Sequence, residues 1–339
     1  MTTMAAGPPA LERARRLLEP ELRDAVARLD PANQAIAAYH LGWTEADGRE
    51  RKASGGKAIR PAMALLAAEA CGGDPEIGLP AAVAVELVHN FSLIHDDLMD
   101  GDRERRHRPT VWALWGIPAA VLAGDAMLVL AQEELLAAGR AGPSAAALLG
   151  RSVADLIRGQ TEDLAFETRS WVSLAECRRM AAGKTGALLS ASARTGAVLA
   201  GAGGDVIEAL GRYGEHFGMA FQLVDDVLGI WGDPAVTGKP VLSDLRSKKK
   251  SLPVTYVLGR ADEPARELAR WLTEPGPPSE SELPRIAELI EDADGRAWAI
   301  AEAEREVESA VNAVHSVALI EPARAELIAL TSFLTSRKA

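Results

Sequence analysis

The sequence predicts an all-α protein, folded as a single large helical bundle. Ala and Leu dominate the apolar residues, aromatic residues make up only 4%, and no segment shows a strong strand pattern. Small and unbranched apolar residues favour closely packed helices, whereas strands are rich in β-branched and aromatic residues. The 339 residues, 48% of them apolar, are enough for one large core, so we expect a single domain over residues 1–339.

Apolar residues recur three and four positions apart along the chain, and this spacing predicts the helices in order. We expect them near residues 10–29, 58–71, 76–100, 117–139, 144–168, 173–200, 204–231 and 244–260, with C-terminal helices over about 279–337. Glycine and proline mark the breaks between them. The clearest linker, residues 274–278 with the sequence EPGPP, is expected to separate the bundle from its C-terminal helices.

Charge and composition exclude several classes of protein. A net charge of −11 disfavours nucleic acid or anionic membrane surfaces as partners. Cys71 and Cys177 lack the spacing of a zinc site or a disulfide framework. The N-terminus has no apolar run typical of a signal peptide, and the longest apolar segment, residues 117–131, is interrupted by Asp125. We therefore expect a cytoplasmic protein without integral membrane association.

Two aspartate clusters inside apolar stretches indicate a metal site. The clusters consist of Asp96, Asp97 and Asp100, and of Asp225 and Asp226. Carboxylates among apolar neighbours lose hydration and repel one another, so they need a compensating cation. Asp96 and Asp100 would lie one helical turn apart on one face, an arrangement that suits Mg²⁺. We expect a divalent ion between two helices; a lone DDxxD can also be a solvated acidic helix end.

Cationic residues flank the first aspartate cluster. Four arginines follow it, and the segment GGKAIRP with Lys57 and Arg60 precedes it. Guanidinium groups bind phosphate oxygens in bidentate fashion, and lysine adds a compact charge. Cations beside an expected Mg²⁺ site indicate a substrate that carries a diphosphate, or two such substrates.

These motifs, taken in order, resemble those of the trans-isoprenyl diphosphate synthases, the polyprenyl synthetase family, over about residues 50–256. The motifs are GGKAIRP, ELVHNFSLIHDDLMD, RRHRPT, GDAML, GQ, KTG, FQLVDD, GDPAVTGK and SDLRSKKKS. Each motif alone is only a hypothesis, and their order makes the resemblance specific. It implies an isoprenoid synthase bundle with a central active-site cavity, a homodimer, and Mg²⁺-dependent head-to-tail condensation of isopentenyl diphosphate with an allylic diphosphate. Three Mg²⁺ ions are expected in each active site.

The resemblance also implies roles for individual residues. The diphosphate of isopentenyl diphosphate is expected to meet Lys57, Arg60, His89 and Arg106. The allylic diphosphate is expected to meet Arg105, and Lys239 and Lys249 are expected to be further diphosphate contacts. The metal ligands would be Asp96, Asp97, Asp100, Asp225 and Asp226. The groups beside the ionising allylic carbon would be Lys184, Thr185 and Gln222.

Four positions depart from the family's pattern. Gly229 stands where many members carry a third aspartate, Ala58 replaces a frequent arginine, and His107 replaces the glycine of RRG. Lys248 occupies a frequent glycine position, so the assignment of Lys249 is open to a shift by one residue. A run of three lysines is otherwise typical of a solvated basic surface.

The product is expected to be geranylgeranyl diphosphate, a C20 compound, with farnesyl diphosphate as the alternative. Phe91 lies five positions before Asp96, the DDLMD motif has no insertion, and Ser92 is small. In the family this pattern is associated with C20 products; the alternative is that Phe91 is an ordinary core residue. Two other classes stay open: a terpene cyclase, which binds only one diphosphate, and a weakly active partner subunit of another synthase, which Gly229 keeps possible.

Overall fold

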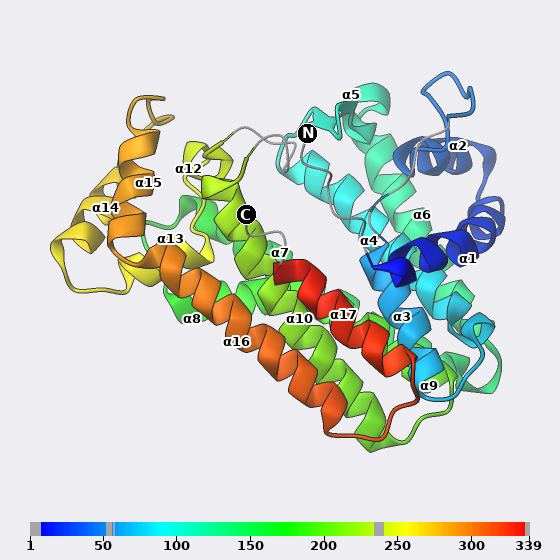
Figure 1. Ribbon diagram of the computed structural model, residues 1–339. Helices are drawn as coiled ribbons and strands as arrows, with labels where there is room; N and C mark the ends of the chain where they lie inside the picture. The colour runs from blue at the N-terminus through cyan, green and yellow to red at the C-terminus, as the bar shows by residue number, and fades with distance from the viewer. Residues whose placement is uncertain (1–7, 52–55, 57, 234–240, 336–339) are drawn as a thin grey trace, which may run out of the picture. The chain divides into compact units, whose positions relative to one another are not determined.

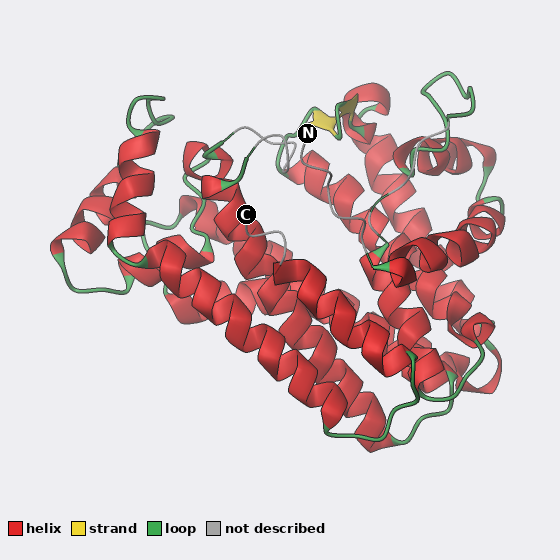
Figure 2. Cartoon of the chain, in the orientation of Figure 1, coloured by secondary structure: helices red, strands yellow, loops and turns green. Residues whose placement is uncertain are grey.

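The computed structural model describes residues 8–51, 56, 58–233 and 241–335. As expected, the fold is all-α (Figures 1 and 2). Within the described ranges, extended structure is confined to an isolated bridge and a short antiparallel pair, β1 (Glu104–Arg105) and β2 (Arg108–Pro109). The chain divides into two compact units, so the single domain stays a prediction. Unit 1 comprises Met1–Val153, Ala191–Gly211 and Val317–Leu327, and unit 2 comprises Ala154–Ser190, Arg212–Ser316 and Ile328–Ala339.

Unit 1 is built around a long apolar helix, α4. Its elements are α1 (Pro9–Val26), α2 (Pro31–His40), α3 (Ile59–Ala70), η1 (Pro75–Gly78), α4 (Leu79–Met99), α5 (Val111–Trp115), α6 (Ile117–Leu136) and η2 (Gly139–Ala141). Helix α4 packs against α3 and α6, and α1 contacts both α3 and α4. Helix α2 was not predicted, although Asp30 caps it by accepting from the backbone N–H groups of Ala32 and Asn33.

The apolar character of α4 is explained by its place in this core. Residues Pro75–Met99 are long and apolar enough to cross a membrane by length and composition alone, but 61% of the apolar window is buried inside the fold. The expectation that residues 117–131 form the longest apolar segment was therefore wrong. A helix surrounded by other helices is apolar on most of its circumference, whatever its length.

The remaining helices form unit 2, and some of them extend into the residue ranges of unit 1. They are α7 (Gly142–Thr168), α8 (Leu174–Ala181), the π-helical turn η3 (Ala182–Gly186), α9 (Ala187–Leu199), α10 (Gly204–Trp231), α12 (Ser243–Arg246), α13 (Leu252–Leu258), α14 (Glu263–Thr273), α15 (Leu283–Asp292), α16 (Gly295–His315) and α17 (Ala323–Thr335). The single helix expected over residues 244–260 is two helices, because Lys248 has φ 52° and so interrupts the helical backbone.

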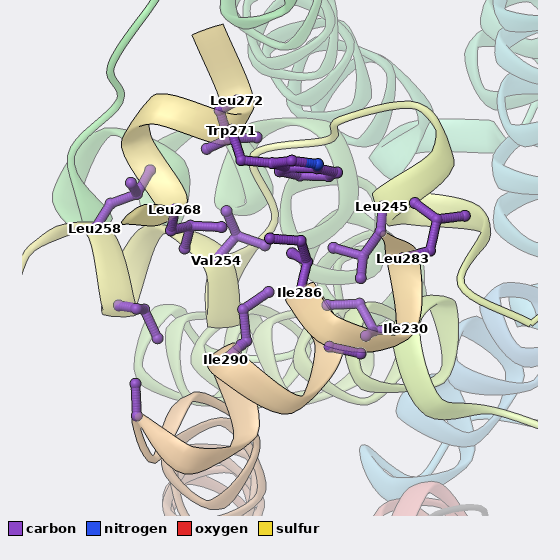
Figure 3. Packing of buried hydrophobic residues seen from close by; sticks show 13 residues of the cluster. Ile230, Leu245, Val254, Leu258, Leu268, Trp271, Leu272, Leu283, Ile286 and Ile290 are labelled. Carbon is purple, nitrogen blue, oxygen red and sulfur yellow. The ribbon is translucent and has the colours of Figure 1, made fainter. Parts of the chain in front are cut away.

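One apolar core of unit 2 joins helices on both sides of the proline-rich linker. Buried side chains of α14 and α15 belong to the same cluster, which also includes residues of α13. Figure 3 shows Leu268 and Trp271 of α14 close to Ile286 and Ile290 of α15. The linker at residues 274–278 therefore connects two helices of one core, and the expectation that it separates bundle from tail was wrong.

Candidate active site

The first aspartate motif lies at the C-terminal end of α4. Asp96 is partly exposed, and Asp100, the C-cap residue, is exposed. The backbone N–H of Asp100 donates to the carbonyl of Asp96 at 2.8 Å, so the two residues are one helical turn apart, as expected. A helix C-terminus carries partial negative charge, and carboxylates there are unfavourable unless a cation is near. This pair therefore gains stability from a bound cation.

Asp97 lies in a different environment from its neighbours in the motif. Its side chain is 1% exposed, and Arg105 Nε donates to Asp97 Oδ1 at 2.7 Å. The other carboxylate oxygen is buried without a hydrogen-bond partner among the described residues. Burial raises the pKa of Asp97 to about 6, and Arg105 acts in the opposite direction. The ligand role of Asp97 stays a prediction; in this structure a guanidinium holds its carboxylate.

The β1–β2 hairpin places the next two arginines. Its turn residues, Arg106 and His107, have φ of 54° and 60°, the positive values that a type I′ turn requires. Arg105 reaches Asp97, while Arg106 lies against Gly56, where an added Cβ would come within 3.2 Å of Arg106 Nη2. The glycine at position 56 thus leaves room for the guanidinium.

A cavity of about 150 Å³ in unit 1 lies beside Arg106. Its lining includes Arg15, Trp43, Gly56, Glu86, Asn90 and Arg106. Arg15 Nε donates to the carbonyl of Gly56 at 3.1 Å, and Asn90 Nδ2 donates to Glu86 Oε1 at 3.0 Å. Burial raises the pKa of Glu86, whereas Arg60 and Arg106 act to lower it. The lining is therefore mixed, with the Arg106 guanidinium and the buried Glu86 carboxyl among apolar side chains such as Leu18 and Leu22.

Arg60 and His89 share this environment. Burial lowers the pKa of Arg60 to about 10, and its Nε has no hydrogen-bond partner in the described part of the chain. Burial is the main cause that lowers the pKa of His89 well below its ordinary value, and the positive charges of Arg60 and Arg106 act in the same direction. The imidazole is therefore neutral at pH 7. The structure thus brings together three of the four residues expected to meet isopentenyl diphosphate; the fourth, Lys57, lies outside the described residues.

A second cavity in unit 1, of about 130 Å³, shares Arg106 with the first. Its lining includes Tyr39, His40, Asp97, Arg105, Arg106 and Arg108. Burial lowers the pKa of His40 to about 3, and Arg105, Arg106 and Arg108 act in the same direction. Arg108 is itself occupied, because it donates to the carbonyls of Tyr39 and Thr44. His40 is neutral at pH 7 and adds no further cation to this cluster.

The two residues expected to limit product length are buried on α4. Phe91 is 5% exposed and makes an edge contact with the ring of His95 at 5.5 Å between centroids. Ser92 donates its hydroxyl hydrogen to the carbonyl of His89 at 2.8 Å. His95 in turn lies 3.2 Å from the carbonyl of Val121 on α6, which ties α4 to α6 next to Phe91.

The second aspartate motif lies near the C-terminal end of α10, in unit 2. Asp225 is exposed, whereas Asp226 is buried and accepts from Gln222 Nε2 at 2.8 Å and from the backbone N–H of Leu252 at 2.9 Å. Burial raises the pKa of Asp226 to about 6, while Lys249 acts to lower it. Thr185 donates its hydroxyl hydrogen to Gln222 Oε1 at 2.7 Å. The structure therefore connects two of the three expected catalytic residues to the motif.

The third, Lys184, lies with Thr185 in the π-helical turn between α8 and α9. Such turns are rare and occur frequently at functional sites, because they change the direction of a few side chains within a helix. Lys184 Nζ lies 2.6 Å from Asp163 Oδ2. The glycine of the GQ motif is required here, since a Cβ on Gly159 would lie 2.3 Å from the backbone nitrogen of Lys184.

The structure distinguishes the lysines of the basic run. Lys249 Nζ lies 3.8 Å from Asp226 Oδ1 and 4.0 Å from Asp244 Oδ2. Burial alone would lower the pKa of Lys249, but the surrounding carboxylates raise it overall, so the ammonium stays charged. Lys248 instead donates to the carbonyl of Glu274 at 2.6 Å. The position of Lys249 therefore agrees with the unshifted assignment. Lys239 falls outside the described residues.

The residues present fit a magnesium ion by their chemistry. Asp96 and Asp100 on α4, and Asp225 on α10, are at least partly exposed carboxylates, the hard oxygen donors that Mg²⁺ prefers. The described part of the chain assembles no group of three or more His, Cys, Asp or Glu side chains for a metal. Mg²⁺ usually keeps several waters and takes other ligands from substrate phosphates, so one or two carboxylates are enough to hold it.

Sequence reasoning missed three residues at these sites: Arg15, His40 and Glu86. Only Glu86 left a readable signal, because an acidic residue one helical turn before His89 is unusual in so apolar a helix. Arg15 and His40 reach the site from α1 and α2, and no local spacing predicts contacts across so many residues.

Comparisons with known proteins agree with this chemistry. The family model described as polyprenyl synthetase matches residues 47–290. A (2E,6E)-farnesyl diphosphate synthase of Mycobacterium tuberculosis is 52% identical over 335 residues, which cover 98% of this chain and 93% of the relative. A geranylgeranyl diphosphate synthase of the same organism is 42% identical over 334 residues, covering 98% of this chain and 94% of the relative.

Solved structures show the same fold. A polyprenyl synthetase from Streptomyces coelicolor is similar with a TM-score of 0.92 and 48% identity, over 96% of this chain and 98% of that one. A geranylgeranyl pyrophosphate synthase from Corynebacterium glutamicum, complexed with isoprenyl diphosphate and magnesium, has a TM-score of 0.78 and 27% identity, over 97% of each chain.

Proposed function

Because the chain belongs to the polyprenyl synthetase family and is a head-to-tail isoprenyl diphosphate synthase, we propose that its main product is farnesyl diphosphate. One observation carries the choice of a C15 product: the farnesyl diphosphate synthase relative is 52% identical, and the geranylgeranyl diphosphate synthase of the same organism is 42% identical, over nearly the whole chain. The C20 product expected from the sequence becomes the second candidate. The small Ser92 next to Phe91 favours it, because it leaves room for a longer chain.

Isopentenyl diphosphate is proposed to bind beside the cavity of about 150 Å³ in unit 1. Arg60 and Arg106 supply guanidinium groups for its diphosphate, and Lys57 is proposed to add an ammonium. His89 is neutral and can donate one hydrogen bond without adding charge. Arg15 donates to the carbonyl of Gly56 and so keeps Gly56 next to Arg106.

The allylic diphosphate is proposed to leave as its negative charge is stabilised. Arg105, Lys184 and Lys249 carry the positive charge for this step, and each is held by an aspartate: Asp97, Asp163 and Asp226. Their orientation is therefore fixed before the substrate arrives. Magnesium would supply further charge stabilisation when bound; the proposed ligands are Asp96 and Asp100 in unit 1, supported by Asp97, and Asp225 in unit 2, supported by Asp226.

The carbocation left on the allylic carbon needs polar atoms that do not react with it. Thr185 and Gln222 are proposed to offer oxygen atoms there, and their mutual hydrogen bond keeps both from moving freely. The double bond of isopentenyl diphosphate then attacks this carbon, and the proton lost from the resulting cation goes to the departing diphosphate. Buried apolar residues such as Phe91 exclude water, which would otherwise convert the cation to an alcohol.

We also propose that the protein works as a homodimer. Helix α6 exposes four large apolar side chains, each more than half exposed: Ile117, Leu122, Val129 and Leu136. Monomeric proteins rarely leave such a row open to water, so a second copy is the simplest cover. Sedimentation velocity on the wild type and on a Leu122→Glu, Val129→Glu variant tests this, and a monomeric wild type would refute it.

A product assay tests the proposed function. The purified protein is incubated with Mg²⁺, isopentenyl diphosphate and one of three allylic diphosphates (dimethylallyl, geranyl or farnesyl), and the products are identified by mass. A C15 diphosphate from the first two starters, with little extension of farnesyl diphosphate, is the expected result. Efficient extension to C20 would favour the second candidate. Hydrocarbon from a single diphosphate, or absence of turnover, would refute the proposal and favour a cyclase or a partner subunit.

A further inference from the structure

The carboxylate of Asp244 occupies the space next to Gly229 that a side chain would fill. A Cβ built on Gly229 would lie 2.4 Å from both Cγ and Oδ2 of Asp244 and 2.6 Å from its Oδ1. Distances this short do not occur between non-bonded atoms, so any larger residue at position 229 displaces the carboxylate. Gly229 comes three residues after Asp226 on α10, where many members of the family carry a third aspartate.

Several contacts fix Asp244 in this place. It lies in the first turn of α12, just after Leu242, whose φ of 63° sets the direction of the chain. The Ser243 hydroxyl lies 3.2 Å from the carbonyl of Gly229, and the backbone N–H of Lys249 donates to the carbonyl of Asp244 at 2.8 Å. The side chain of Asp244 is 13% exposed. These contacts hold the segment from Ser243 to Lys249 in one conformation, in which the Asp244 carboxylate lies against Gly229 on α10.

The Lys249 ammonium lies between two carboxylates that come from different elements. Its Nζ is 3.8 Å from Asp226 on α10 and 4.0 Å from Asp244 on α12. With one of these partners removed, the balance of attraction changes and the ammonium moves toward the carboxylates that remain, which include Asp163 and Asp225. Lys249 remains 36% exposed, so its charge is available to an anion from outside.

We propose that Asp244 is a positioning residue for Lys249, and that its carboxylate stands in the place left open by the glycine of the second aspartate motif. Asp226 and Asp244 together hold the lysine where it meets a diphosphate that carries magnesium. This rests on the proposed function. Asp244 acts through Lys249, whose Nζ lies 4.0 Å from the Asp244 carboxylate.

Three variants test the proposal by their affinity for Mg²⁺ and inorganic pyrophosphate together, measured by isothermal titration calorimetry. Asp244→Asn removes the charge but keeps the shape. Gly229→Ala removes no charge and displaces the carboxylate. We expect each to weaken binding about tenfold, equivalent to about 1.4 kcal/mol. The double variant Gly229→Asp, Asp244→Ser returns a carboxylate to nearly the same space, and we expect affinity within about threefold of the wild type.

The controls separate this role from a general effect on folding or charge. Asp292→Asn removes one exposed carboxylate from the same unit and is expected to bind as the wild type does. Melting temperatures without ligand should stay within a few degrees for every variant. Unchanged affinity in Asp244→Asn, or losses that simply add in the double variant, would overturn the proposal.

The assay is also independent of turnover. If the wild type binds pyrophosphate but forms no prenyl product, the proposed function fails and the role of Asp244 can still be decided. If the wild type does not bind Mg²⁺ and pyrophosphate, the positioning role itself is refuted. In an active enzyme, Asp244→Asn should raise the KM for the allylic substrate more than it lowers kcat, a split that a loss of stability does not produce.

Discussion

Acidification should destabilise the protein through His40, and the size of the effect follows from its surroundings. Burial and the nearby guanidinium groups of Arg105, Arg106 and Arg108 lower the pKa of His40 to about 3. The unfolded chain binds a proton at this residue below its ordinary pKa of 6.5, and the folded chain does not. The contribution of His40 to stability is therefore fully present above pH 6.5 and is lost as the pH falls toward 3.

Between about pH 7.5 and pH 5.5 the expected loss is about 1.4 kcal/mol in the free energy of unfolding. The figure depends little on the folded pKa, because any value below about 5 leaves the folded histidine mostly neutral at both pH values. Asp97 and Asp226 act in the opposite sense: their raised folded pKa of about 6 favours the folded state as the pH falls through 6 toward the ordinary value of 3.8. The wild type alone therefore does not isolate His40.

The comparison needed is between the wild type and His40→Gln, by urea denaturation at both pH values. The substitution should be less destabilising at pH 5.5 than at pH 7.5 by about 1.4 kcal/mol, because only the wild type then loses the contribution of His40. His315→Gln, a substitution of an exposed histidine, supplies the baseline for removing an imidazole. An equal effect of His40→Gln at the two pH values would refute the reasoning.

Three further predictions concern turn geometry, packing and the product. His107→Gly should raise the free energy of unfolding by about 1 kcal/mol in urea denaturation, since His107 has φ 60°; a loss of stability would contradict this. Trp271→Ala should lower the free energy of unfolding by about 3–5 kcal/mol, because Trp271 is 2% exposed in the core shown in Figure 3. A loss below about 1 kcal/mol would contradict this packing. Phe91→Ala should give products with longer prenyl chains, as measured by mass analysis. An unchanged product would show that Phe91 does not limit the chain length.

Much of the fold could be predicted because long amphipathic and apolar helices leave a strong periodic signal. The helices carrying both aspartate motifs were expected at 76–100 and 204–231, and the structure has them at Leu79–Met99 and Gly204–Trp231. The short helix α2 escaped prediction, because ten residues give too few turns for a periodic pattern. The prediction of one helix over 244–260 was wrong for a different reason. The apolar spacing continues across Lys248, whose positive φ of 52° interrupts the helix and leaves no trace in the spacing.

The residue types of the candidate site could be predicted, but which aspartates are buried against a cationic side chain and which are exposed could not. Adjacent aspartates look alike in sequence, yet Asp96 is partly exposed while Asp97 is buried against Arg105, and Asp225 is exposed while Asp226 is buried beside Lys249. In each pair, one carboxylate can meet a cation from solvent and the other holds a cationic side chain of the protein. Helical geometry accounts for this, because neighbouring residues point about 100° apart.

The departures from the family's glycine pattern have a structural meaning that the sequence concealed. His107 and Lys248 both stand where glycine is frequent, and both have positive φ, 60° and 52°. A non-glycine residue costs about 1 kcal/mol or more in this conformation. The surrounding contacts must therefore impose it, as the β1–β2 pairing does at His107 and as the Glu274 carbonyl does for Lys248. Strain of this kind concentrates at functional sites, and here it lies in the two loops that carry Arg106 and Lys249. Having His107 and Lys248 in place of glycine thus affects the stability of these two loops. The charges of Arg106 and Lys249 are retained.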